Sequence, residues 1–118
     1  MSIGDILKSV VSALDESRGV GVVGMDGILV EEQKKDGELD LQALGAEFCG
    51  LIKTAETALE NLGTGPTGEM IINTEGAILL VKRVNPEYFL LLVTRPDCNI
   101  GKGRFLLRRF GEQLKKEL

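Results

Sequence analysis

The side chains that most often carry chemistry are scarce in this chain. Its 118 residues include no histidine, which removes the commonest general base, the commonest metal ligand and the usual pH switch. Cys98 lies beside Asp97 and Arg95, but no base is at hand to activate its thiol. Glu31 and Glu32 could bind a cation, although a solvated pair on an edge strand explains them more simply. We therefore expect no catalytic residue and no metal ligand.

Two glycine-containing stretches invite comparison with phosphate-binding loops. Gly63–Gly68, GTGPTG, lacks the Gly-Lys-Ser/Thr ending of a nucleotide phosphate loop, so we interpret it as a plain loop. Gly101-Lys102-Gly103 has the composition of an anion-binding helix start, but a helix start with a surface lysine is the simpler interpretation. Neither stretch predicts a bound nucleotide, and the sequence predicts no cofactor and no enzymatic activity.

The composition is typical of one globular domain spanning residues 1–118. Hydrophobic residues make up 43% of the chain and aromatic residues only 4%, so the core must be built from Leu, Ile, Val and Ala. Cys49 and Cys98 have no paired spacing, which favours a reducing, cytoplasmic location. No apolar run approaches the length of a membrane span and the N-terminus has no basic lead-in, so we expect neither membrane insertion nor a signal peptide.

The charge is unevenly distributed along the chain. The net charge is −4, which argues against nucleic acid as a partner. The last 19 residues nevertheless carry six Lys/Arg against two Asp/Glu. A solvated face that balances the acidic remainder explains these cations better than binding to nucleic acid or anionic lipid, since the face shows no interleaved aromatic residues. They are Lys102, Arg104, Arg108, Arg109, Lys115 and Lys116.

Hydrophobic periodicity predicts three helices and five strands in the order α-ββ-α-βββ-α. Ser2 is expected to cap a helix over Ser2–Asp15, with Asp5 in capping-box spacing and a left-handed Gly19 at its end. Asp26-Gly27 predicts a two-residue hairpin turn in which both residues have positive φ. The other predicted elements are strands over Gly19–Val23, Ile28–Val30, Glu69–Thr74, Ala77–Val84 and Tyr88–Thr94, and helices over Leu39–Leu62 and after Asn99.

The long helix at Leu39–Leu62 carries two apolar lines. We expect the broader line to face the core, and the narrower one to be a second packing surface at which small residues let another backbone approach. Ordinary packing of the narrower line against the sheet is the alternative. The broader line is Leu41, Leu44, Phe48, Leu51, Ala55, Ala58 and Leu62, the narrower is Gly45, Cys49, Ile52 and Glu56, and Glu47, Lys53 and Glu60 remain for solvent.

The strand order follows from which strands are most apolar. Tyr88–Thr94 is apolar on both faces and should lie centrally, beside the first strand. With hairpin pairings this gives an α+β sandwich, a five-stranded antiparallel sheet in the order 2-1-5-4-3 with helices on both faces. Strands 2 and 3 become edges. The third carries Met70, Ile71 and Ile72, and an open apolar edge favours pairing with another chain.

Three stretches together resemble the Roadblock domain of dynein light chains and of bacterial and archaeal regulators of Ras-like GTPases. These are GVGVVGMDGILV after the first helix, the long helix leading into GTG, and the closing helix IGKGRFLLRRF. The resemblance covers nearly the whole chain and implies a Roadblock-like, profilin-like fold. Its motifs are structural, and the family supplies no active-site residue to transfer. The chain lacks the long terminal extensions that some members use.

The resemblance implies a dimer in which the long helices pack together and the third strands pair. It also implies a small Ras-like GTPase as partner, whose hydrolysis such regulators stimulate without an arginine of their own. We expect a homodimer with its interface at Gly45, Cys49, Ile52, Glu56, Met70, Ile71 and Ile72, and GTPase docking at Glu47, Lys53 and Glu60. The alternative is a ligand-sensing module of the PAS, GAF or profilin-like kind, which would need a polar or aromatic residue inside a pocket.

Overall fold

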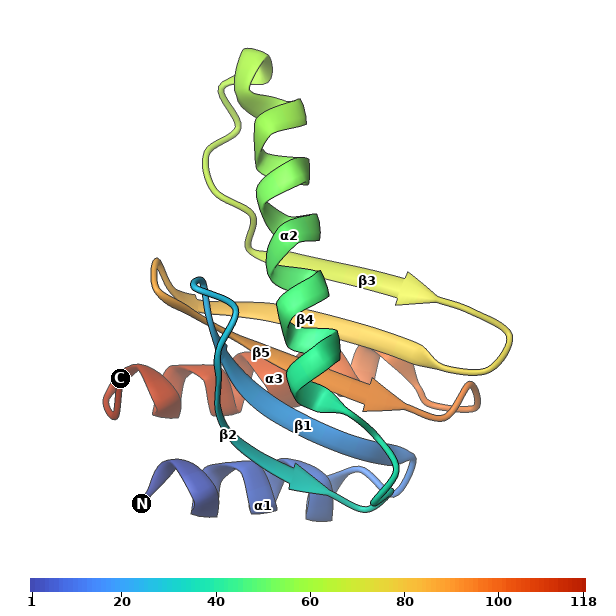
Figure 1. The fold of residues 1–118 in the computed structure, drawn as a ribbon. Coiled ribbons are helices and arrows are strands. Elements are labelled where there is room, and N and C mark those ends of the chain that lie inside the picture. The colour runs from blue at the N-terminus through green and yellow to red at the C-terminus, as the bar shows by residue number, and fades with distance from the viewer.

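A five-stranded antiparallel sheet in the order β2-β1-β5-β4-β3 separates two layers of helix (Figure 1). This confirms the predicted sheet, its order and both of its edges. The computed structural model describes all 118 residues. The elements are α1 (Ile3–Ala13), β1 (Ser17–Gly24), β2 (Leu29–Lys34), α2 (Leu41–Leu59), a 3-10 turn η1 (Glu60–Leu62), β3 (Glu69–Asn73), β4 (Ile78–Asn85), β5 (Tyr88–Thr94) and α3 (Ile100–Lys115).

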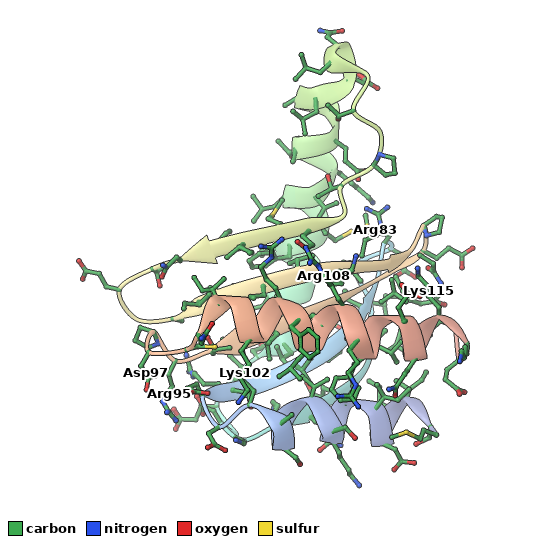
Figure 2. All side chains as sticks on the ribbon, turned by 180° about the vertical axis from the view of Figure 1, so that it is seen from behind. Arg83, Arg95, Asp97, Lys102, Arg108 and Lys115 are labelled. Carbon is green, nitrogen blue, oxygen red and sulfur yellow. The ribbon has the colours of Figure 1, made fainter.

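Each face of the sheet carries its own apolar core. Helices α1 and α3 lie side by side on one face, and α2 alone covers the other (Figures 1 and 2). Strand β5 contributes to both cores, because Leu90 and Leu92 point toward α1 and α3 while Leu91 and Val93 point toward α2. The prediction that this strand is central and covered on both sides is confirmed.

The helix caps follow from local hydrogen bonds. Ser2 and Asp5 form the predicted capping box at the start of α1. Asn99 caps α3 by accepting a hydrogen bond from the backbone N–H of Lys102 at 3.1 Å. The predicted end of the first helix is wrong, because α1 stops at Ala13 and Gly19 lies inside β1 without a positive φ.

The turn between β1 and β2 differs from the predicted two-residue turn. Gly27 has φ of 87°, but no residue other than glycine has a positive φ, so Asp26 does not share that conformation. The N–H of Gly27 donates to the carbonyl of Gly24, and the Asp26 carboxylate accepts from the N–H of Ile28. These bonds describe a three-residue loop that ends in a left-handed glycine. Strand β2 then continues to Lys34, beyond the predicted strand.

The sheet-facing side of α2 combines the narrower apolar line with the first part of the broader one, since Leu41 and Phe48 are buried as predicted. The narrower line faces the protein's own sheet: Gly45, Cys49 and Ile52 are buried, and the Cys49 thiol donates to the carbonyl of Met25 at 3.0 Å. Gly45 is small because Val23 occupies the space in which a side chain would lie. Ordinary packing against the sheet therefore explains this line, and Leu51 of the broader line is exposed instead.

Helix α2 is longer than the sheet is wide. It crosses the sheet steeply, and its C-terminal half projects past β3, so that this end stands away from the sheet (Figure 1). Leu59 lies on the same side of the helix as the buried Ile52, by the helical period, yet it is exposed. At Leu59 the helix has passed beyond the edge of the sheet, so no strand covers this side chain.

The crowding at Gly45 predicts the effect of adding one methyl group. A Cβ there would lie 2.9 Å from a methyl carbon of the fully buried Val23. We expect Gly45→Ala to lower the free energy of unfolding by about 1–3 kcal/mol, in spite of alanine's better helix propensity. Gly50→Ala on the same helix is the matched control, since nothing lies within 4 Å of its Cβ position, and should raise stability by about 0.5–1 kcal/mol. Urea denaturation of both variants measures this, and equal stabilisation of both would contradict the packing.

Candidate protein-interaction surface

An apolar stripe on the projecting half of α2 has no partner within the protein. Its members recur at spacings of three and four residues and so lie along one side of the helix. Leu51 is 44% exposed and Leu62 is 72% exposed. Small residues lie between them, which would let a second helix approach closely. The stripe, called the α2 stripe below, consists of Leu51, Ala55, Ala58 and Leu62, the last of them in η1.

The outer edge of β3 is open. Strand β3 pairs only with β4, so the backbone groups on its other side are free. Met70 and Ile72 pack against the core under α2, whereas Ile71 points to the opposite face of the sheet and is exposed. Figure 1 shows that α2 continues beyond this open strand edge at its C-terminal end.

The carboxylate of Glu56 holds the loop after α2 against the helix. It accepts a hydrogen bond of 2.7 Å from the backbone N–H of Thr67 and one of 3.0 Å from Arg83 of β4. These bonds, the one from Thr67 foremost, lower the pKa of Glu56 against the opposing effect of burial. Glu56 thus serves the protein's own structure, where the sequence suggested an interface residue.

A second carboxylate fixes β3 from the other face. Glu69 accepts hydrogen bonds from Arg108 and Arg104 of α3, each at 2.9 Å. Its pKa is lowered, mainly by the bond from Arg108, while burial acts in the opposite direction. Strand β3 is therefore fastened to α3 at its first residue.

The predicted docking residues divide into two groups. Lys53 and Glu60 line an open hollow of about 490 Å³ between α2 and the loop that follows it. They are seven residues apart, two turns of helix, and so share one side. Glu47 is also exposed but lies outside this hollow, roughly 120° around the helix from Lys53. The structure therefore brings together two of the three residues.

Buried polar side chains in the interior bear on the ligand-sensing alternative. The two buried polar side chains are satisfied locally, Ser17 by the carbonyl of Leu14 at 2.7 Å and Thr94 by that of Arg95 at 2.9 Å. Neither therefore points into a cavity. Cys98 is buried, and burial raises the pKa of its thiol. No cluster of three His, Cys, Asp or Glu side chains has the proximity to hold a metal ion. None of the helices has the length and apolarity of a membrane span.

The basic face of α3 differs from the sequence interpretation in one residue. An interleaved aromatic is present, because Phe105 lies among these cations and is 61% exposed. The buried side of the helix is as predicted, with Gly103, Leu107, Phe110 and Leu114 facing the sheet. Assigning each phenylalanine of this helix to a helix face would have separated Phe105 from Phe110. It would have shown from the sequence that Phe105 lies on the basic side. The Glu56–Arg83 pair joins residues 27 positions apart and has no such local signal.

The ion pair at Glu56 predicts a pH-dependent contribution to stability. The folded-state pKa of Glu56 is lowered from 4.5, so its contribution is complete above that value and is lost as the pH falls through the folded-state pKa. We expect Glu56→Gln to cost about 1 kcal/mol at pH 7, with the difference from wild type shrinking below about pH 4.5. Urea unfolding from pH 7 to pH 3 measures this. Glu60→Gln is the matched control and should change the free energy of unfolding little, because Glu60 makes no ion pair. A loss of stability in Glu56→Gln that stays constant from pH 7 to pH 3 would refute the electrostatic account.

Comparison with known proteins yields matches among solved structures. No protein-family profile matches the chain, and no curated protein sequence does. MglC from Myxococcus xanthus is 36% identical over 97% of both chains, with a TM-score of 0.68. A Roadblock/LC7 domain from Streptomyces avermitilis is 11% identical with a TM-score of 0.88, covering 99% of this chain and 98% of that one. Myxococcus xanthus MglB is 14% identical with a TM-score of 0.88, covering 97% and 92%.

The last two matches show the shared fold, and the identity with MglC over nearly the full length shows kinship. The five-stranded sheet in the order β2-β1-β5-β4-β3 agrees with that kinship. The chain belongs to the Roadblock/LC7 family.

Proposed function

We propose that this protein is a homodimeric, non-catalytic regulator of a small Ras-like GTPase. The observation that carries the proposal is the uncovered flank formed by the α2 stripe and the β3 edge. Membership of the Roadblock/LC7 family supports a regulatory role toward such a GTPase. A flank with exposed leucines and an unpaired strand edge is a liability for a monomer, and a second copy would cover both features at once.

The proposed dimer joins two β3 edges about a two-fold axis. Antiparallel pairing there would extend the sheet across both protomers and bring the two projecting α2 helices side by side. Met70, Ile71 and Ile72 keep the interface role that the sequence suggested. On the helix, the α2 stripe takes the place of Gly45, Cys49 and Ile52, because those three side chains are already buried on their own sheet.

Charge placed in the α2 stripe should weaken this dimer without unfolding the protomer. Leu51→Glu would bury an unpaired carboxylate in the interface, at a cost of several kcal/mol, so we expect the dissociation constant to rise at least about 100-fold. Thr57→Glu is the matched control, because Thr57 is exposed on another side of the same helix. Sedimentation velocity at micromolar concentration measures both variants. Unchanged dimerisation of Leu51→Glu would place the interface elsewhere.

The exposed side of the paired α2 helices is the proposed docking surface for the GTPase. Lys53 and Glu60 share one side of the helix, whereas Glu47 lies roughly 120° around it from Lys53. We propose that two copies of the helix present these mostly acidic residues to the GTPase. A GTPase with basic residues beside its switch loops complements them. Since the γ-phosphate orders those loops, a partner that reads them should bind the GTP form in preference to the GDP form.

Binding to purified Ras-like GTPases from the source organism tests the docking surface. We expect the dimer to retain a GTPase loaded with a non-hydrolysable GTP analogue at least about tenfold better than one loaded with GDP, and Glu60→Lys to weaken retention several-fold. Any stimulated hydrolysis should survive Arg104→Ala and Arg108→Ala, because both arginines bind Glu69 on the sheet face away from α2. Loss of rate by orders of magnitude would identify an arginine finger and refute this surface.

A further inference from the structure

The phenyl ring of Phe105, on α3, is exposed to solvent. Figure 2 shows α3 on the side of the molecule that faces the viewer. The ring is 61% exposed, while its neighbours Leu106 and Leu107 are buried beneath the helix. An aromatic side chain can bury a large area on a partner at little entropic cost, which is why such residues anchor interfaces. Nothing in the protein's own fold covers Phe105.

The cations around Phe105 differ in whether their charge is already balanced. Arg104 and Arg108 are bound to Glu69, and Lys115 to Glu112. Lys102 and Arg109 form no ion pair. They lie three residues before and four residues after Phe105, so both neighbour the ring on the helix surface. The result is an apolar ring between two positive charges without ion-pair partners, on a protein whose net charge is −4. The guanidinium of Arg109 lies over the ring of Phe110, 5.6 Å from its centroid, and keeps its full charge there.

We propose that Lys102, Phe105 and Arg109 form a docking surface for an acidic amphipathic helix of a protein partner. Lys102 and Arg109 are seven residues apart, which puts them two helical turns or about 10 Å from one another along the axis. A partner helix with carboxylates two turns apart and a large apolar residue midway matches this spacing. The charges would select the partner and its register, and the ring would supply the buried area.

An anionic membrane fits the same surface less well. Two cations without ion-pair partners supply only about 1 kcal/mol each near a charged bilayer, and one aromatic ring adds little insertion. The remaining chain is strongly acidic and would be repelled by the lipid. A single partner helix can contact this patch alone, so that the acidic remainder of the protein does not approach a second extended negative surface.

This surface is independent of the proposed GTPase and dimer surfaces. It lies on α3, behind the sheet from α2, and away from the α2 stripe (Figures 1 and 2). A partner could therefore bind to this surface while α2 is bound to a second copy or to a GTPase. The inference can be tested separately from the proposed function.

A synthetic helical peptide of about 14 residues tests the inference, with Glu two turns apart and Leu midway. We expect titration into the full-length ¹⁵N-labelled protein to shift resonances along Lys102–Arg109. Phe105→Ala should weaken binding about tenfold, and Lys102→Glu with Arg109→Glu at least as much. Lys115→Glu with Lys116→Glu is the matched control, because it changes the charge of the same helix equally and should weaken binding less than about twofold.

Three outcomes would overturn the inference. One is an absence of shifts on α3. Another is a result showing that the position or sign of the charges does not matter. This would be equal weakening of binding by the two double charge reversals, or equal binding of a peptide with Lys in place of Glu. The third is Phe105-dependent binding of the protein to phosphatidylserine vesicles together with no binding of the peptide, which would identify a lipid surface. Thermal unfolding of each variant establishes that the fold is intact.

Discussion

The whole architecture depends on covering β5 on both of its faces. Its side chains are apolar on each side, so water must be excluded from both faces of the sheet at its centre. Helices α1 and α3 do this together on one face. On the other face α2 does it alone, by crossing the strands steeply (Figure 1). A single crossing helix covers the central strands and then continues past β3, and the uncovered flank is the consequence of that geometry.

Two carboxylates tie the elements of the uncovered flank to their neighbours. Glu56 ties the loop after α2 to the helix and to β4, and Glu69 ties β3 to α3. Each carboxylate is hydrogen-bonded by an arginine from a different element, so the projecting helix and the edge strand are each tied to a neighbouring element. A preorganised surface loses less conformational entropy on association, which suits the proposed function of binding partners through this flank.

The sequence predicted the framework because its signals are local or periodic. The capping box at Ser2, the alternation in the strands and the doubly apolar Tyr88–Thr94 each follow from neighbouring residues. The two lines of α2 could not be assigned in this way, because helical period shows that both are apolar without showing which members of each meet the sheet. That choice rests on Val23, which fills the space over Gly45 and lies 22 residues away in the chain. The Glu56–Arg83 pair likewise joins distant residues and was missed.

The central claim is that the α2 stripe is covered by a second copy of this chain. Isotope-filtered nuclear Overhauser spectroscopy on a mixture of labelled and unlabelled protein tests it most directly, since only contacts between copies give signals. The account predicts signals between protomers from the methyl groups of Leu51 and Leu62, and none from Ile52, which is buried on its own sheet. Signals from Ile52, or a protein that dimerises without any from Leu51 and Leu62, would contradict it.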